Sequence, residues 1–376
     1  MTQIYLDSNA STPIAPEVAD AMRPFLSEHF GNPSSHHWAG APAKAALDKA
    51  RGQIAALLGC QPSGIVFTSG GTEANNHAIK GAFFPRRHKG NHIITTQIEH
   101  PATLQPCRFL ERLGAEVTYL PVDGTGLVDP DDVRRALRPT TILVSVMHAN
   151  NEVGTIQPIS EIARLTRECG VLLHTDAAQS VGKVPTRVTE LGVDLLSVAG
   201  HKVYAPKGVG ALFVREGVTL EPLMHGAGHE SGRRAGTENV LLAVGLGAAC
   251  ELAAAELESR GARITELRDY FHEGLRTLFG ARLHLNGHPT LRLPNTLNVG
   301  FEGRLGSDVL EALPEVAAST GSACHAGSRE LSPVLKVMGV PEAIGFGAVR
   351  FSLGRGTTRA EIKQVLEWLK TRVLAA

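Results

Sequence analysis

Short apolar runs rich in β-branched residues alternate with longer stretches of helical periodicity over the first two thirds of the chain. Runs such as Thr141–His148 are almost continuously apolar, which is typical of strands covered on both faces. The alternation predicts a mostly parallel, doubly wound α/β sheet. The expected strands are Gly64–Ser69, His92–Thr96, Glu116–Leu120, Thr141–His148, Val171–Thr175, Asp194–Val198 and Val209–Val214. The expected helices include Ala41–Leu58, Thr72–Arg86, Ala102–Leu113 and Ile159–Glu168.

The pattern changes where a long helical stretch runs from Glu238 to about Phe279. Shorter elements follow it. We expect strands at Thr296–Phe301 and Ala348–Leu353, a helix near Ser307–Leu313 and a terminal helix at Arg359–Leu374. The sequence therefore predicts a large α/β domain that extends to about residue 260 and a smaller α+β domain after it.

Composition excludes several classes of protein. The 376 residues contain 37 Lys and Arg against 37 Asp and Glu, so no basic excess favours nucleic acid or a membrane surface. No apolar stretch approaches the ~20 residues that span a bilayer, and the first residues lack the pattern of a secretory signal. Five cysteines are a sparse and odd number for a disulfide framework. We expect a soluble cytoplasmic protein that binds neither nucleic acid nor membrane.

Three motifs that follow expected strands carry candidate chemistry. Ser69–Thr72 links a strand to a helix through two glycines, which suits a phosphate cradle, or a tight turn with Thr72 as helix cap. Asp176 follows a buried strand and is either the partner of a protonated ring nitrogen or a helix cap. Lys202 follows another strand and is either a Schiff-base lysine or a surface lysine. Together they supply what pyridoxal 5'-phosphate (PLP) needs from a protein.

Two further residues point to a substrate. Cys324 lies among small residues beside His325, in a segment that looks like an exposed loop, where a neighbouring imidazolium can lower the pKa of a thiol. Arg350 lies inside the apolar run Ala348–Leu353, where an arginine is costly unless it meets an anion. Its planar fork suits a substrate carboxylate, and a structural ion pair is the alternative.

These segments together resemble the cysteine desulfurases, fold-type I PLP enzymes of the class V aminotransferase family. The resemblance implies a large PLP-binding domain over residues 12–260. Residues 1–11 and 261–376 then form a small α+β domain that carries the Cys324 loop. The matching segments are Tyr5–Asp7, Gly31–Ser35, Phe67–Asn76, Ile98–His100, Met147–Gly154, His174–Gln179, Gly200–Lys202, Arg234–Asn239, Gly321–Cys324 and Arg350–Thr358.

The resemblance also implies a role for each cofactor residue. Lys202 would form the Schiff base with PLP and move the Cα proton of the substrate, while Asp176 would keep the pyridine nitrogen charged. His100 would stack on the ring and shuttle protons, and Gln179 would bond the phenolic oxygen. The phosphate would be bound by Gly71, Thr72, His201 and, from a second subunit, Thr237.

For the substrate, the resemblance implies that Asn151 and Arg350 clamp the carboxylate of L-cysteine. Cys324 would attack the substrate sulfur, which leaves L-alanine and a Cys324 persulfide. The implied enzyme is a homodimer without a metal ion, and it delivers sulfur to an acceptor protein of iron–sulfur cluster assembly or of a thiolation pathway.

Some positions depart from this family. Ala199 stands where the family has a phosphate-binding serine, and Ala235 replaces a second serine. The absence of that first serine, together with Cys324-His325 and the segment Ser332–Leu335, is similar to selenocysteine lyases, so release of selenium from L-selenocysteine is an alternative function.

Two alternatives come from other classes. Sixteen histidines suggest a metal-dependent hydrolase, although no His-Glu-x-x-His or Cys-x-x-Cys run is present. A non-catalytic binding or scaffold protein is the third possibility. The presence of Lys202, Asp176, Cys324 and Arg350 argues against it.

Overall fold

Seven strands form a central sheet in the order β2-β8-β7-β6-β5-β3-β4 in a computed structural model, which describes residues 3–320 and 330–374. The strands from β4 to β7 run parallel, and β8 is antiparallel to both of its neighbours. This arrangement confirms the predicted α/β class. The strands are β2 (Ile65–Thr68), β3 (His92–Thr96), β4 (Glu116–Leu120), β5 (Thr141–Ser145), β6 (Leu172–Asp176), β7 (Leu195–Ala199) and β8 (Gly210–Val214).

Helices cover both faces of this sheet because adjacent residues of each central strand face opposite layers. Ile94 and Val144 pack with α2, α6 and the first half of α8, whereas Ile93 and Leu143 pack with α3 and α4. The helices are α1 (Pro16–Met22), α2 (Gly40–Leu58), α3 (Gly71–Arg86), α4 (Pro101–Glu111), α5 (Pro130–Ala136), α6 (Ile159–Glu168), α7 (Val188–Leu191) and α8 (Val240–Phe279).

A second group of elements packs around its own apolar core. Its three-stranded antiparallel sheet has the order β12-β10-β9, and β1 (Ile4–Tyr5) pairs in parallel with β11 (Val316–Ala317) nearby. Phe271, Phe301 and Phe351 lie in this core. The remaining elements are β9 (Leu283–Asn286), β10 (Thr296–Phe301), α9 (Gly306–Glu311), α10 (Pro333–Val337), α11 (Glu342–Gly345), β12 (Ala348–Ser352) and α12 (Arg359–Trp368), which continues as a π-helix over Leu369–Leu374.

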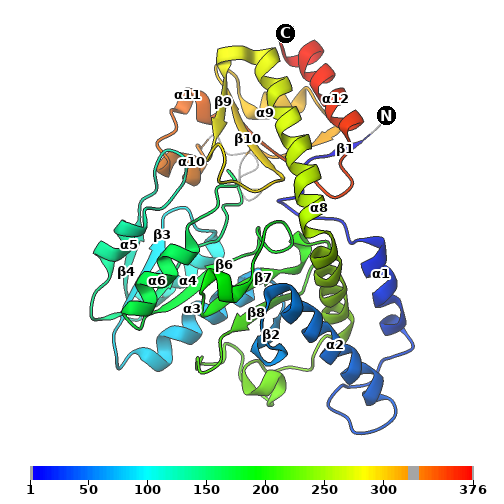
Figure 1. Ribbon diagram of the computed structural model, residues 1–376, viewed down its shortest axis with the longest axis vertical. Helices are drawn as coiled ribbons and strands as arrows, with labels where there is room; N and C mark the ends of the chain where they lie inside the picture. The colour runs from blue at the N-terminus through cyan, green and yellow to red at the C-terminus, as the bar shows by residue number, and fades with distance from the viewer. Residues whose placement is uncertain (1–2, 321–329, 375–376) are drawn as a thin grey trace.

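The long helix α8 joins the two groups of elements (Figure 1). Its first half belongs to the core of the large sheet and its second half to the core of the small sheet. These separate cores support a domain boundary near residue 260, which stays a prediction. The N-terminal strand β1 lies with the second group through its pairing with β11.

Close packing explains the glycines in the apolar half of α8. A Cβ at Gly247 would lie 2.6 Å from the Cα of Ala50 in α2, and one at Gly245 would lie 2.7 Å from the Sδ of Met22. By length and composition the helix Val240–Arg282 would suffice to cross a membrane, contrary to the sequence expectation. Its apolar residues pack against α1 and α2 instead, so the composition reflects a core helix.

The junction between α8 and the small sheet gives a first prediction. Phe271 is fully buried and its ring packs edge-to-face on Phe351, with centroids 5.0 Å apart. We predict that Phe271→Ala lowers the free energy of unfolding by about 3–5 kcal/mol in urea titrations, because the cavity cannot close. Leu291→Ala, at a position 51% exposed, is the control and should cost less than about 0.5 kcal/mol. Equal losses in both variants would contradict this packing.

Candidate active site

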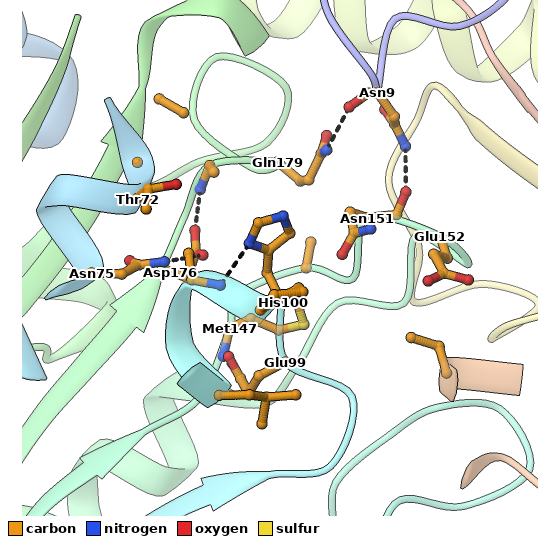
Figure 2. Close-up of a pocket in the computed structure, with 18 of the residues that line it drawn as sticks. Asn9, Thr72, Asn75, Glu99, His100, Met147, Asn151, Glu152, Asp176 and Gln179 are labelled. Atoms are coloured by element: carbon orange, nitrogen blue, oxygen red, sulfur yellow. Dashed lines mark hydrogen bonds between the residues drawn. The ribbon is translucent and has the colours of Figure 1, made fainter. Parts of the chain in front are cut away.

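A cavity of about 460 Å³ lies at the carboxyl ends of the parallel strands, between the large sheet and β12 of the small sheet. Ligands of open α/β sheets bind at this edge. Figure 2 shows His100, Asp176 and Gln179 on the cavity wall. The expected site residues that line the cavity are Gly71, Thr72, His100, Asn151, Asp176, Gln179, His201, Lys202 and Arg350.

Asp176 ends β6 and presents a fixed carboxylate to the cavity. Its Oδ2 accepts a hydrogen bond from Nδ2 of Asn75 at 2.6 Å, and its Oδ1 accepts one from the backbone N–H of Ala178 at 2.9 Å. The next helix begins only at Val188, so the helix-cap interpretation of Asp176 is wrong. These two hydrogen bonds fix the orientation of the Asp176 carboxyl group at the cavity wall.

His100 caps the N-terminus of α4 with its ring. The backbone N–H of Ala102 donates to Nδ1 at 3.0 Å, so the proton of the neutral imidazole is on Nε2. Burial lowers the pKa of His100; Asp176 raises it and Lys202 lowers it further. His100 therefore presents a neutral ring with a defined tautomer to the cavity.

Lys202 lies in the cavity wall, directly after β7, and not on an exposed loop. Its Nζ donates to the backbone carbonyls of Asn9 and, at 2.8 Å, Ala10. Burial and neighbouring cations lower the pKa of His201 to about 4, so its imidazole is neutral at pH 7. A neutral imidazole still offers one N–H to an anion.

The start of α3 forms a cradle for an anion. The helix begins at Gly71, and Gly70 precedes it with φ +149°, a conformation that favours glycine. The Thr72 side chain does not cap α3, so that interpretation is wrong. Gly71 and Thr72 in the first turn of α3 line the cavity, and a Cβ at Gly71 would approach the Cβ of Ala199 to 3.1 Å. The N–H groups of a first helical turn have no partner within the helix and favour an anion.

Arg350 on β12 is 2% exposed and faces the opposite side of the cavity. Its Nη1 donates to the carbonyl of Asn151 at 2.9 Å, and its Nη2 donates to Oδ1 of Asp7 at 2.8 Å. The ion pair with Asp7 is thus real, while the buried Nε has no hydrogen-bond partner among the described residues. Both sequence interpretations of Arg350 are compatible with this geometry.

Sequence reasoning missed several wall residues, of which Glu99 is the clearest. Its Oε1 accepts from Thr96 Oγ1 at 2.7 Å and from the backbone N–H of Met147 at 2.8 Å. Burial raises the pKa of Glu99 to about 8, so the side chain is mostly protonated at pH 7. The sequence signal that could have identified Glu99 is its position directly before His100.

Cys324 falls within residues 321–329, outside the described residues. The described residues on both sides of this segment form hydrogen bonds with residues that line the cavity. Ser319 and Arg350 exchange backbone hydrogen bonds of 3.2 and 2.7 Å. The Ser332 hydroxyl donates to the buried carboxylate of Glu152 while it caps α10.

Thr237 is exposed and does not line the cavity of its own chain. The segment before it is pinned by two ion pairs. Glu230 accepts two hydrogen bonds of 2.7 Å from Arg51, and Arg234 donates to Glu73 at 2.9 Å. Thr237 therefore lies at the surface, directly after a segment that two ion pairs hold in place.

Comparison with known proteins gives one consistent result. The aminotransferase class-V family profile matches residues 4–365. The chain is 50% identical to the cysteine desulfurase IscS of Dictyoglomus turgidum over 370 residues, which cover 98% of this chain and 94% of the relative. It is 51% identical to the IscS of Methanosarcina thermophila over 366 residues, covering 97% and 90%.

Solved structures agree with the sequence matches. A NifS-like protein is 37% identical, with a TM-score of 0.92 over 98% of each chain. The structure described as SspA in complex with cysteine is 40% identical, with a TM-score of 0.83 over 94% of this chain and 99% of that one.

His174, on β6 beneath the cavity, gives a prediction about pH. Its ring lies between the hydroxyls of Ser145 (2.8 Å) and Ser197 (3.0 Å), and burial lowers its pKa to about 4. In the unfolded chain His174 binds a proton as pH falls below its ordinary pKa of ~6.5, whereas in the native protein it does so only near its lowered pKa of about 4. The stability from this group is therefore lost as pH falls through that window.

We predict that His174→Gln reduces the loss of unfolding free energy between pH 7 and pH 5 by about 2 kcal/mol, measured in urea at both pH values. His225→Gln is the control, because its side chain is 72% exposed. An unchanged pH dependence in His174→Gln would show that His174 is not held neutral.

Proposed function

The chain belongs to the aminotransferase class-V family, and on that basis we propose that it is a cysteine desulfurase that uses PLP. It converts L-cysteine to L-alanine and passes the sulfur to Cys324 as a persulfide. The observation that carries this function is the match to desulfurases at about half identity over nearly the whole chain. The cavity, which gathers Asp176, Lys202 and Arg350, supports it.

The cavity residues fit PLP at each end of the molecule. The Asp176 carboxylate would face the pyridine nitrogen, and the Lys202 amine would bind the aldehyde carbon. The first turn of α3 with Gly71 and Thr72, together with His201, would hold the phosphate. Bound there, PLP supplies an electron sink that stabilises negative charge at the substrate Cα.

The other roles belong to residues of this chain. Arg350 and Asn151 would hold the substrate carboxylate, because a guanidinium binds a carboxylate with two parallel hydrogen bonds. Lys202 would take and return the Cα proton, and neutral His100 would move a proton at Nε2.

Sulfur transfer is assigned to Cys324. Its thiolate forms an S–S bond to the substrate sulfur while the C–S bond breaks. The electron pair of that bond stays with the amino-acid fragment, which takes up a proton and leaves as alanine.

The rival functions have less support. Three curated relatives that match nearly the whole chain are named cysteine desulfurases, which does not favour the selenocysteine lyase suggested by Ala199 and His325. They also leave the metal-dependent hydrolase and the non-catalytic scaffold without support.

A homodimer is part of the proposal. Thr237 is exposed and lies outside the cavity of its own chain, which is compatible with a role at the phosphate of a second subunit. Large apolar side chains are also exposed near the N-terminus, as a subunit interface requires: Leu26 (69%), Phe30 (74%) and Trp38 (82%). We further propose that the enzyme is cytoplasmic and supplies a sulfur-acceptor protein in iron–sulfur cluster assembly, the pathway that the name IscS of its relatives suggests.

Replacing the proposed sulfur carrier tests the reaction. We predict that Cys324→Ala lowers alanine formation from L-cysteine by at least about 100-fold, because no thiolate remains to accept the sulfur. Cys169→Ala, which removes an exposed free cysteine, should leave the rate unchanged. Wild-type activity on L-selenocysteine with little on L-cysteine would move the function to a lyase. Full cysteine turnover in Cys324→Ala would contradict the persulfide.

Mixed dimers test whether Thr237 acts across the interface. Lys202→Ala and Thr237→Val chains should each be weakly active alone. A mixed dimer regains one complete site if Thr237 serves its partner, so we expect about half of the wild-type rate per mixed dimer. If Thr237 served its own chain, both sites of the mixed dimer would stay defective and no activity would return.

A further inference from the structure

Lys183 is a second lysine at the back of the site, with an enclosed amine. It lies four residues after Gln179 in the turns that follow β6. Its Nζ donates to Oε1 of Gln179 at 2.8 Å and to Oδ1 of Asn9 at 3.2 Å. Both acceptors are side-chain amides, so neither of these hydrogen bonds pairs the amine with a carboxylate.

The surroundings of Lys183 favour a neutral amine. Burial lowers its pKa well below the ordinary value, and the cations of Lys202, Arg350 and Arg260 lower it further. A neutral amine retains two N–H groups, which are enough for the two hydrogen bonds. The contacts that Lys183 makes with Gln179 and Asn9 are hydrogen bonds that its amine donates.

The hydrogen bond from Lys183 fixes the orientation of the Gln179 amide. With Oε1 held by Lys183, Nε2 faces the backbone carbonyl of Asn9 and donates to it at 2.9 Å. A flipped amide would bring two carbonyl oxygens together at Asn9 and would leave the amine without its acceptor. The second N–H of Gln179 is consequently left for the cavity.

Lys183 also holds Asn9, and Asn9 holds Lys202. The Asn9 side chain accepts from Lys183 and from Nδ2 of Asn295 at 3.0 Å, while the Asn9 carbonyl accepts from Lys202. Lys183 and Lys202 also line one small void of about 30 Å³ behind the cavity. The two lysines are thus linked through a residue that both contact.

We propose that Lys183 is a positioning residue, which turns the second N–H of Gln179 toward the phenolic oxygen of PLP and, through Asn9, holds the Lys202 amine in place. The inference rests on the proposed function for the identity of the cofactor. A donor to the phenolic oxygen stabilises the form of the enzyme-bound cofactor that has lost its proton. Loss of that donor therefore raises the pH midpoint of the cofactor's absorbance change.

The test compares holoenzymes loaded with PLP in absorbance titrations from neutral to alkaline pH. Lys183→Met keeps the volume of the side chain and removes both N–H donors. We expect its midpoint to rise by about 0.5 to 1 pH unit and kcat/KM for cysteine to fall about tenfold. Lys207→Met, which removes an exposed lysine close to His201, is the matched control and should keep the wild-type midpoint.

A double-mutant cycle shows whether Lys183 acts through Gln179. Gln179→Leu should raise the midpoint by itself, and adding Lys183→Met should then change it little. Fully additive shifts would overturn the proposal, as would a wild-type midpoint in Lys183→Met. If Lys183→Met does not fold, Lys183→Gln replaces it and should give a smaller rise. A wild-type midpoint in that variant would equally overturn the proposal.

The titration needs bound cofactor but no turnover. Failure of the wild-type enzyme to form alanine from cysteine would therefore refute the proposed function alone. The midpoints would still decide the role of Lys183.

Discussion

The hydrogen bonds that converge on Asn9 hold the two sides of the cavity together. The Asn9 carbonyl accepts from Lys202 and Gln179, which follow strands of the large sheet. Its backbone N–H donates to Ser352 on β12, and its side chain donates to Thr296 on β10 at 2.8 Å. Neither core alone fixes the distance between the cofactor residues and the substrate residues, because these bonds cross between them. The N-terminal segment is thus a structural part of the site.

Burial decides which cavity groups are charged. Asp176 accepts two hydrogen bonds that fix the position of its carboxyl group, while Glu99 is mostly protonated at pH 7 because burial raises its pKa to about 8. His201 is neutral at pH 7 for the same reason. The cavity therefore presents one fixed carboxyl group near the ring position, and N–H donors where anionic groups of cofactor and substrate would bind.

Local sequence patterns predicted the strands of the large sheet and the residues at their ends. Asp176, Lys202 and the start of α3 lie where those patterns indicated. β5 ends at Ser145, three residues earlier than expected, although the backbone N–H groups of Val146 and His148 still donate to the carbonyls of His174 and Asp176 in β6.

The partners of those residues were not predictable. Asn9 meets Thr296 across 287 positions, and Arg350 meets Asp7 across 343, and no local periodicity reports such contacts. Lys183 was missed for a related reason, since an isolated lysine in a turn normally lies on the surface.

Mass spectrometry of the borohydride-reduced holoenzyme is the most direct test of the central claim, that the Asn9-centred cavity is the cofactor site. Borohydride fixes PLP to the amine that bears it, and the labelled peptide identifies the lysine. The account predicts a single label at Lys202. A label at Lys183 or another lysine, or no label on enzyme that releases alanine from cysteine, would contradict it.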